Sequence, residues 1–208
     1  MKSKLFLTAI AVCLSLAGFA QTKGTNALSF GINSSTQNLN NSGDETKYKH
    51  NYFSLGYGNF INDNTKIGME LNYGTTIHRQ SSFYYDQKVK SYGGNLSYQK
   101  YFPIIKKLYA YAGGRGAYSY SKETDSYVSE IRNFNTNEYS IGAYGGITWF
   151  LSKRFAFETN LLSANAYYSE TKGMEDYSGT KQQSKSTSFN LTSDGFINNL
   201  GFKIYLLF

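Results

Sequence analysis

The chain has 208 residues, one cysteine, one proline, a formal net charge of +7 and 17% aromatic residues. The length suits a single domain, and a lone cysteine, Cys13, excludes an internal disulfide framework. The lysines are scattered among acidic residues and form no basic run, which argues against a nucleic-acid partner.

The N-terminal segment has the pattern of a secretory signal peptide. Lys2 and Lys4 precede an apolar run from Leu5 to about Leu16, and small residues follow as far as Ala20. The apolar run is shorter than the ~20 residues of a spanning helix, which argues against a membrane anchor. The pattern predicts a signal peptide at residues 1–20 and one mature domain at residues 21–208.

The rest of the chain predicts β-strands and no helix. Apolar and polar residues alternate with a period of two, and no window shows a helical period. The predicted strands, in chain order, are about Asn26–Ser34, Tyr48–Ile61, Lys66–Ile77, Lys88–Phe102, Leu108–Ser121, Glu138–Leu151, Phe155–Tyr167 and Phe189–Phe208.

Long polar stretches alternate with short breaks between these strands. The long stretches are Ser34–Lys47, His78–Gln87, Lys122–Asn137 and Ser169–Ser188, and the short breaks are Asn62–Thr65, Pro103–Lys107 and Ser152–Arg154. In an up-and-down arrangement, this order collects all long loops at one end and all short turns at the other. Transmembrane barrels have this asymmetry.

The composition of the polar face distinguishes a membrane barrel, in which this face lines the lumen, from a soluble β protein, in which it is the exterior. In Lys66–Ile77, Ile67, Met69 and Leu71 share one face, while the other face carries small residues and Glu70. Small residues with few charges suit the narrow lumen of an eight-stranded barrel, and a water-facing exterior would carry more Lys and Glu. A membrane barrel is therefore favoured over a soluble β protein.

Three motifs carry a resemblance to a known family. They are the terminal LGFKIYLLF, the turn-containing FINDNTKIGMELNYG, and the strand–turn–strand pair YQKYFPIIKKLYAYAGGRGAYSYS and GGITWFLSKRFAFETN. With the signal peptide, they resemble the small eight-stranded outer-membrane β-barrel proteins of Gram-negative bacteria.

The resemblance implies an all-β fold, an eight-stranded antiparallel up-and-down transmembrane β-barrel with short periplasmic turns and long extracellular loops. It also implies an outer-membrane location and a structural or surface-interaction role through four loops. The terminal stripe resembles the signal that the barrel-assembly machinery reads; its residues are Leu200, Phe202, Ile204, Leu206 and Phe208.

Isolated charges on the polar faces predict a charge network in the barrel interior. Its members are Glu70, Arg115, Glu158 and Lys203. Position along the strands predicts that Glu158 pairs with Lys203 and that Glu70 faces Arg115. Such a network serves either as a structural plug, which the narrow lumen favours, or as a gate or narrow ion path.

Basic residues cluster where the second, third and fourth strands reach the long loops. The anionic partner that fits this place is lipopolysaccharide, and its predicted contacts are Lys47, Lys49, Arg79, Lys88 and Lys90.

The sequence predicts no enzyme, cofactor or metal site. His50 and His78 match no catalytic motif, and the glycine-rich Ala112–Ser121 lacks the Lys-Ser/Thr and the helix of a phosphate loop. The alternatives left open are a narrow channel or small hydrophobic-compound porter, and a lipid A-modifying enzyme. The surface ligand is not predicted.

Overall fold

A computed structural model describes residues 22–41, 44–80, 85–126, 131–173, 183–193 and 202–208. All regular elements in these ranges are strands. Within the same ranges, no helix is long and apolar enough to span a membrane. The predicted signal peptide lies outside the described residues.

The strands in chain order are β1 (Asn26–Asn41), β2 (Asp44–Asn62), β3 (Thr65–Gln80), β4 (Tyr85–Ile105), β5 (Leu108–Ser126), β6 (Ile131–Phe150), β7 (Phe155–Gly173), β8 (Gln183–Thr192) and β9 (Phe202–Leu207). All their pairings are antiparallel.

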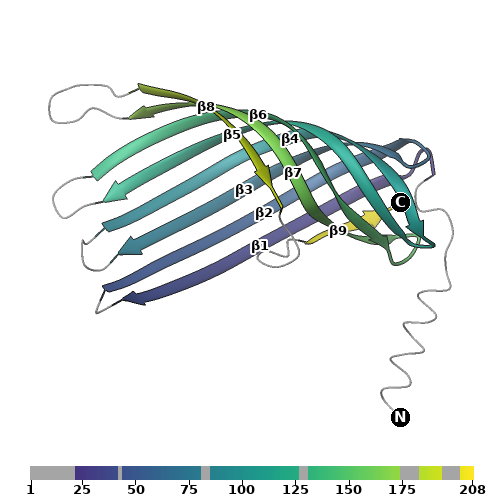
Figure 1. The fold of residues 1–208 in the computed structure, drawn as a ribbon, viewed down its shortest axis with the longest axis horizontal. Helices are drawn as coiled ribbons and strands as arrows, with labels where there is room; N and C mark the ends of the chain where they lie inside the picture. The colour runs from purple at the N-terminus through teal and green to yellow at the C-terminus, as the bar shows by residue number, and fades with distance from the viewer. Residues whose placement is uncertain (1–21, 42–43, 81–84, 127–130, 174–182, 194–201) are drawn as a thin grey trace, which may run out of the picture.

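The sheet closes on itself. Each strand from β1 to β7 pairs with the next one along the chain, and β9 pairs with both β1 and β7. β1 to β7 with β9 therefore make a ring of eight strands, and β8 extends the wall along β7 (Figure 1). The predicted all-β, antiparallel up-and-down ring is confirmed.

The short connections follow turn chemistry. Asn62 pairs with Thr65, and between them Asn64 adopts a φ of 60°, a left-handed conformation that Asn tolerates better than most residues. The β4–β5 hairpin turns at Lys106 and Lys107, after a register shift between Pro103 and Ile105. These turns lie at one end of the ring, where β9 also ends (Figure 1).

The predicted long loops at the other end are wrong in extent. β1 and β2 stay paired up to Asn41 and Asp44, inside the polar stretch predicted as a loop. Pairing also continues up to Gln80 with Tyr85 and Ser126 with Ile131. Polarity alone suggested loops, but a ladder needs only backbone hydrogen bonds and tolerates polar side chains where both faces are wet.

The last predicted strand, Phe189–Phe208, is divided. β8 ends at Thr192, and its Thr192 lies opposite Ser163 of β7. β9 begins at Phe202 and pairs with the first turn-proximal residues of β7, from Phe155 to Glu158. Residues 194–201 are outside the described residues.

The core lies inside the ring at the short-turn end. Its buried hydrophobic members are Ala27, Phe60, Tyr101, Tyr111, Phe150, Ala156, Tyr205 and Leu207, with Tyr109 and Tyr144 packed against them. Most of these side chains are aromatic, because a ring of eight strands has a lumen that large side chains just fill.

Candidate functional site: a filled lumen and an apolar outer wall

Alternate residues face opposite sides of the wall. Along β2, Phe53, Leu55 and Tyr57 are exposed, while Ser54, Gly56 and Gly58 between them are buried. β3 repeats the pattern, with exposed Ile67, Met69 and Leu71. Along the middle of these strands, large apolar side chains therefore cover the outside and small or polar ones face the lumen, as the sequence predicts.

Outward aromatic residues gather near both ends of this apolar wall. Phe102, Trp149, Phe155 and Phe208 are exposed near the short turns. Farther along the strands, exposed tyrosines pair across neighbouring strands: Tyr73 with Tyr92 at 5.2 Å and Tyr118 with Tyr139 at 5.1 Å between ring centroids. Tyr101 and Phe150 have the opposite orientation and fill the lumen, where each is less than a tenth exposed.

Next to the aromatic core, on the side away from the short turns, polar side chains form a layer across the lumen. Glu158 is the centre of this layer. Its side chain on β7 is buried. Oε1 accepts hydrogen bonds from Gln99 Nε2 at 3.1 Å and from the Tyr205 hydroxyl at 3.0 Å. Oε2 accepts from the Tyr101 hydroxyl at 3.2 Å and from Thr148 Oγ1 at 3.0 Å. Four donors from β4, β6 and β9 thus converge on one carboxylate.

Lys66 provides one buried cation of this layer. It is 3% exposed, and its Nζ lies 4.0 Å from the ring centroid of Tyr205 and 5.6 Å from that of Tyr101. Its charge interacts with that of Glu158. Lys66 shares its face of β3 with Glu70, but it was not among the four residues predicted for the charge network.

The four predicted network residues all project into the lumen, but their partners differ from those predicted. Lys203 lies directly opposite Glu158 in register, as predicted, but its ion pair is with Glu70. Asn95 Nδ2 also donates to Glu70 Oε1 at 3.4 Å. Glu158 already accepts four hydrogen bonds, which explains why the Lys203 ammonium bonds to the nearby Glu70 carboxylate.

Arg115 has a neutral partner instead of the predicted Glu70. Its Nη2 and Nε donate to Asn165 Oδ1 at 3.2 Å and 3.4 Å. Its guanidinium carbon lies 5.4 Å from the ring centroid of Tyr144. Asn165 is itself buried, so the guanidinium also satisfies a polar group that water does not reach.

Little space remains within this layer. A cavity of about 40 Å³ lies among these groups, with Lys66, Glu70, Arg115, Glu158 and Lys203 on its walls. That volume holds only a few water molecules. The lumen is therefore filled by paired side chains at this depth.

Another acidic side chain, Glu123, lies on the lumen side of the wall near the ends of the strands opposite the short turns. Glu123 Oε1 accepts a hydrogen bond from Gln87 Nε2 at 2.6 Å. Burial raises the pKa of Glu123, the nearby Asp125 carboxylate raises it further, and the Gln87 hydrogen bond opposes the shift. These residues lie near the ends of β4 and β5, away from the apolar part of the wall.

The two histidines lie on the lumen side near the outer ends. His50 Nδ1 and Thr76 Oγ1 are 3.0 Å apart, and the His78 ring stacks on Tyr48 with centroids 4.2 Å apart. No hydrogen bond joins either histidine to a serine among the residues described. This geometry is that of packed side chains.

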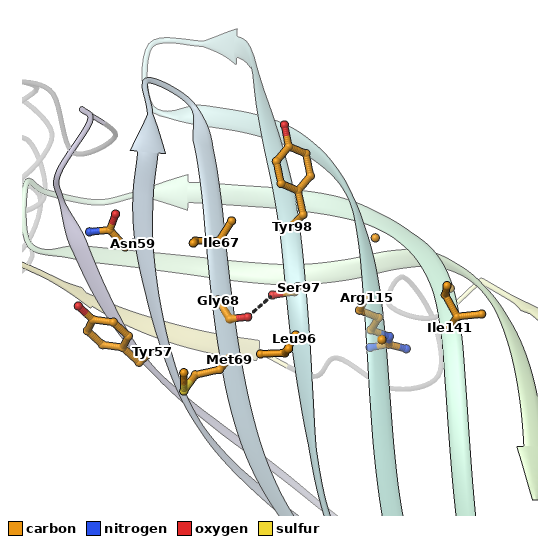
Figure 2. A pocket seen from close by; sticks show the side chains of 13 residues that line it. Tyr57, Asn59, Ile67, Gly68, Met69, Leu96, Ser97, Tyr98, Arg115 and Ile141 are labelled. Carbon is orange, nitrogen blue, oxygen red and sulfur yellow. Dashed lines mark hydrogen bonds between the residues drawn. The ribbon is translucent and has the colours of Figure 1, made fainter.

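The outer wall carries an open apolar depression of about 720 Å³ across β2 to β6. Figure 2 shows Ile67, Leu96 and Tyr98 on neighbouring strands around it. Gly114 and Gly116 of β5 form part of its lining, and Gly116 lies in register between Leu96 of β4 and Ile141 of β6. The glycine-rich stretch Ala112–Ser121 was predicted not to be a phosphate loop, and the depression above it was not predicted.

The five basic residues predicted to contact lipopolysaccharide lie on outward positions near the outer ends. Lys47 pairs in register with Arg79, and Arg79 Nε lies 3.0 Å from Asp86 Oδ2. Lys49, Lys88 and Lys90 are exposed on β2 and β4. Lys122 of β5, which the sequence analysis missed, lies directly opposite Lys90.

The terminal stripe lies on the outer wall where its side chains are described. Ile204, Leu206 and Phe208 are exposed, while the intervening Tyr205 and Leu207 are buried in the core. The backbone of Phe208 exchanges two hydrogen bonds with Asn26, at 2.8 and 3.0 Å. Phe202 opposes Ile32 in register, and Leu200 lies outside the described residues.

Comparison with solved structures finds the same fold. A major outer membrane protein from Thermus thermophilus superposes with a TM-score of 0.52 at 7% identity, covering 89% of this chain and 98% of that one. This chain shares its fold. The ferric yersiniabactin uptake receptor FyuA from Yersinia pestis gives a TM-score of 0.37 at 12% identity, covering 71% of this chain and 25% of the receptor.

Comparison with family models and with curated proteins finds no match. The fold is thus shared with a protein that has few identical residues in common with this chain. The likeness between the two chains is one of strand arrangement and not of sequence identity.

Proposed function

We propose that this chain is an outer-membrane β-barrel with a structural or surface-interaction role at its outer end. The observation that carries the proposal is the distribution of side chains across the wall, which is the reverse of that in a soluble protein. Apolar residues such as Phe53, Leu71 and Ile141 are exposed on the outside, and the charged network lies inside. In water such a wall would aggregate. In a bilayer it is stable, because a closed ring pairs every spanning strand and the apolar face meets hydrocarbon.

The filled lumen favours a structural role over transport. Glu158 with its four donors, the Lys203–Glu70 ion pair and the aromatic core occupy the lumen near the short turns. Solute passage would require several of these contacts to break together. The alternative of a narrow channel or small hydrophobic-compound porter therefore has less support.

The outer ends are where partners would bind. The strands are 16 to 21 residues long from β1 to β7, whereas about 9–11 residues cross a bilayer, so the paired strands continue beyond the membrane. The exposed Lys47, Lys49, Lys88 and Lys90, with Arg79, would lie at the level of lipopolysaccharide phosphates. The exposed Ile204, Leu206 and Phe208 would be read by the barrel-assembly machinery.

Two measurements test this proposal. Cell fractionation should place the protein with outer membranes, and its unheated form should migrate faster on a gel than the boiled form. Purified protein in planar lipid bilayers should give no stable conductance steps. Recovery in the aqueous fraction without detergent would refute the membrane assignment, and regular conductance steps would refute the filled lumen.

A further inference from the structure

Two lysines face each other on the outer wall. Lys90 of β4 and Lys122 of β5 are direct register partners, and both side chains are exposed. Like charges at directly opposed positions destabilise a sheet. Neither ammonium lies within ion-pair distance of a carboxylate in the part of the chain that the structure describes. An anion between them would convert this repulsion into attraction.

These lysines stand directly beyond a band of tyrosines. Two residues toward the short turns, Tyr92 and Tyr120 are also register partners, and Tyr92 contacts Tyr73 on the next strand. Tyrosines of this kind mark the boundary between hydrocarbon and head groups. Lys90 and Lys122 therefore lie at the depth of lipid phosphates.

Below the tyrosines, the same strands carry the apolar depression of Figure 2. Leu96 and Tyr98 of β4 and Ile141 of β6 flank its glycine floor. A Cβ on Gly116 would meet no atom within 4 Å, so the space above this glycine is open. An apolar group from outside the chain would fit there.

The depth difference between the lysine pair and the depression matches the length of a lipid acyl chain. Gly116 and Lys122 are six positions apart on β5. At about 3.3 Å per residue and a tilt of about 40°, six residues descend about 15 Å, half of the ~30 Å hydrocarbon core. A lipid with its phosphate at the lysines would extend its tail to the depth of the depression.

We propose that this wall binds an anionic phospholipid, with the phosphate between Lys90 and Lys122 and an acyl chain over Gly114 and Gly116. Two ammonium groups on neighbouring strands suit a phosphate as point charges. The glycine floor lets the chain approach the backbone. This inference rests on the proposed function, because it requires the wall to face lipid.

Native mass spectrometry of the full chain in nonionic detergent tests the site. Dimyristoyl phosphatidylglycerol is the probe and dimyristoyl phosphatidylcholine the comparison lipid. Lys90→Gln with Lys122→Gln should weaken phosphatidylglycerol binding about 30-fold. Each lysine near an anionic head group contributes roughly a fivefold increase in affinity, and the two contributions multiply. Lys106→Gln with Lys153→Gln, two exposed positions at the short turns, is the control and should change nothing.

Gly116→Leu tests the tail half of the site. Its Cβ would meet no atom within 4 Å, and the rest of the side chain would occupy the depression between Leu96 and Ile141. It should reduce binding of both lipids at an unchanged thermal midpoint. Ala166→Leu, at an exposed outward position of β7, is the matched control. Wild-type lipid binding by Gly116→Leu, or by the double lysine variant, would overturn the proposal. Heat-modifiable gel mobility, read on the same samples, reports the barrel independently of the lipid site.

Discussion

At the scale of single residues, the most constrained groups are Glu158 and Lys66. We predict that Glu158→Gln and Lys66→Met each lower the free energy of unfolding by about 3–5 kcal/mol, because each removes one of two buried opposite charges that interact. The double variant should lose much less than the sum. Urea unfolding of the wild type, both single variants and the double variant in lipid vesicles measures these losses. Additive losses would contradict a coupling between Glu158 and Lys66.

Arg115 provides a second prediction at this scale. Arg115→Met removes both donors to the buried Asn165 Oδ1. We expect a loss of about 1–3 kcal/mol, the cost of an unsatisfied buried polar group. Arg154→Met, at an exposed position beside a short turn, is the control and should leave the unfolding midpoint unchanged. Equal midpoints for both variants would show that the Arg115 contact does not stabilise the fold.

At the scale of one strand, the cost of a charged side chain at an exposed position depends on whether that position faces lipid or water. Leu71 of β3 and Ile131 of β6 are both 68% exposed, but Leu71 lies along the apolar part of the wall and Ile131 at the outer end. We predict that Leu71→Lys costs about 2–4 kcal/mol of folding stability in vesicles, and Ile131→Lys at most about 1. A water-exposed wall would tolerate both lysines equally.

At the scale of the whole molecule, ring closure depends on the short strand β9. Leu28 and Leu206 are register partners on β1 and β9, so cysteines there fit the Cα separation of a disulfide. We predict that Leu28→Cys with Leu206→Cys oxidises to a bridge that keeps the fast gel mobility after heating. Leu28→Cys with Ile204→Cys, displaced by two residues, should not bridge. Efficient bridging in both would contradict the register.

The strand pattern was predictable because period-two alternation needs only one strand and its two environments. Ile67, Met69 and Leu71 on one face and Lys66, Gly68 and Glu70 on the other are fixed by residue order alone. The short turn at Asn62–Thr65 was likewise a local property. The ends of the strands were not, since the polar residues from Ser34 to Lys47 gave no sign of the backbone pairing that continues through most of them.

Period-two alternation and turn residues are local properties, and they were enough to predict the all-β class, the up-and-down order and the apolar face of each strand. Closure of the ring was expected only from the family resemblance, because it depends on β9 pairing with the distant strands β1 and β7. The contacts across the lumen emerged only in the folded structure. Lys203 pairs with Glu70, Arg115 with Asn165, and four donors converge on Glu158. Those choices depend on strand register and tilt, which bring together residues distant in sequence, and no local pattern encodes them.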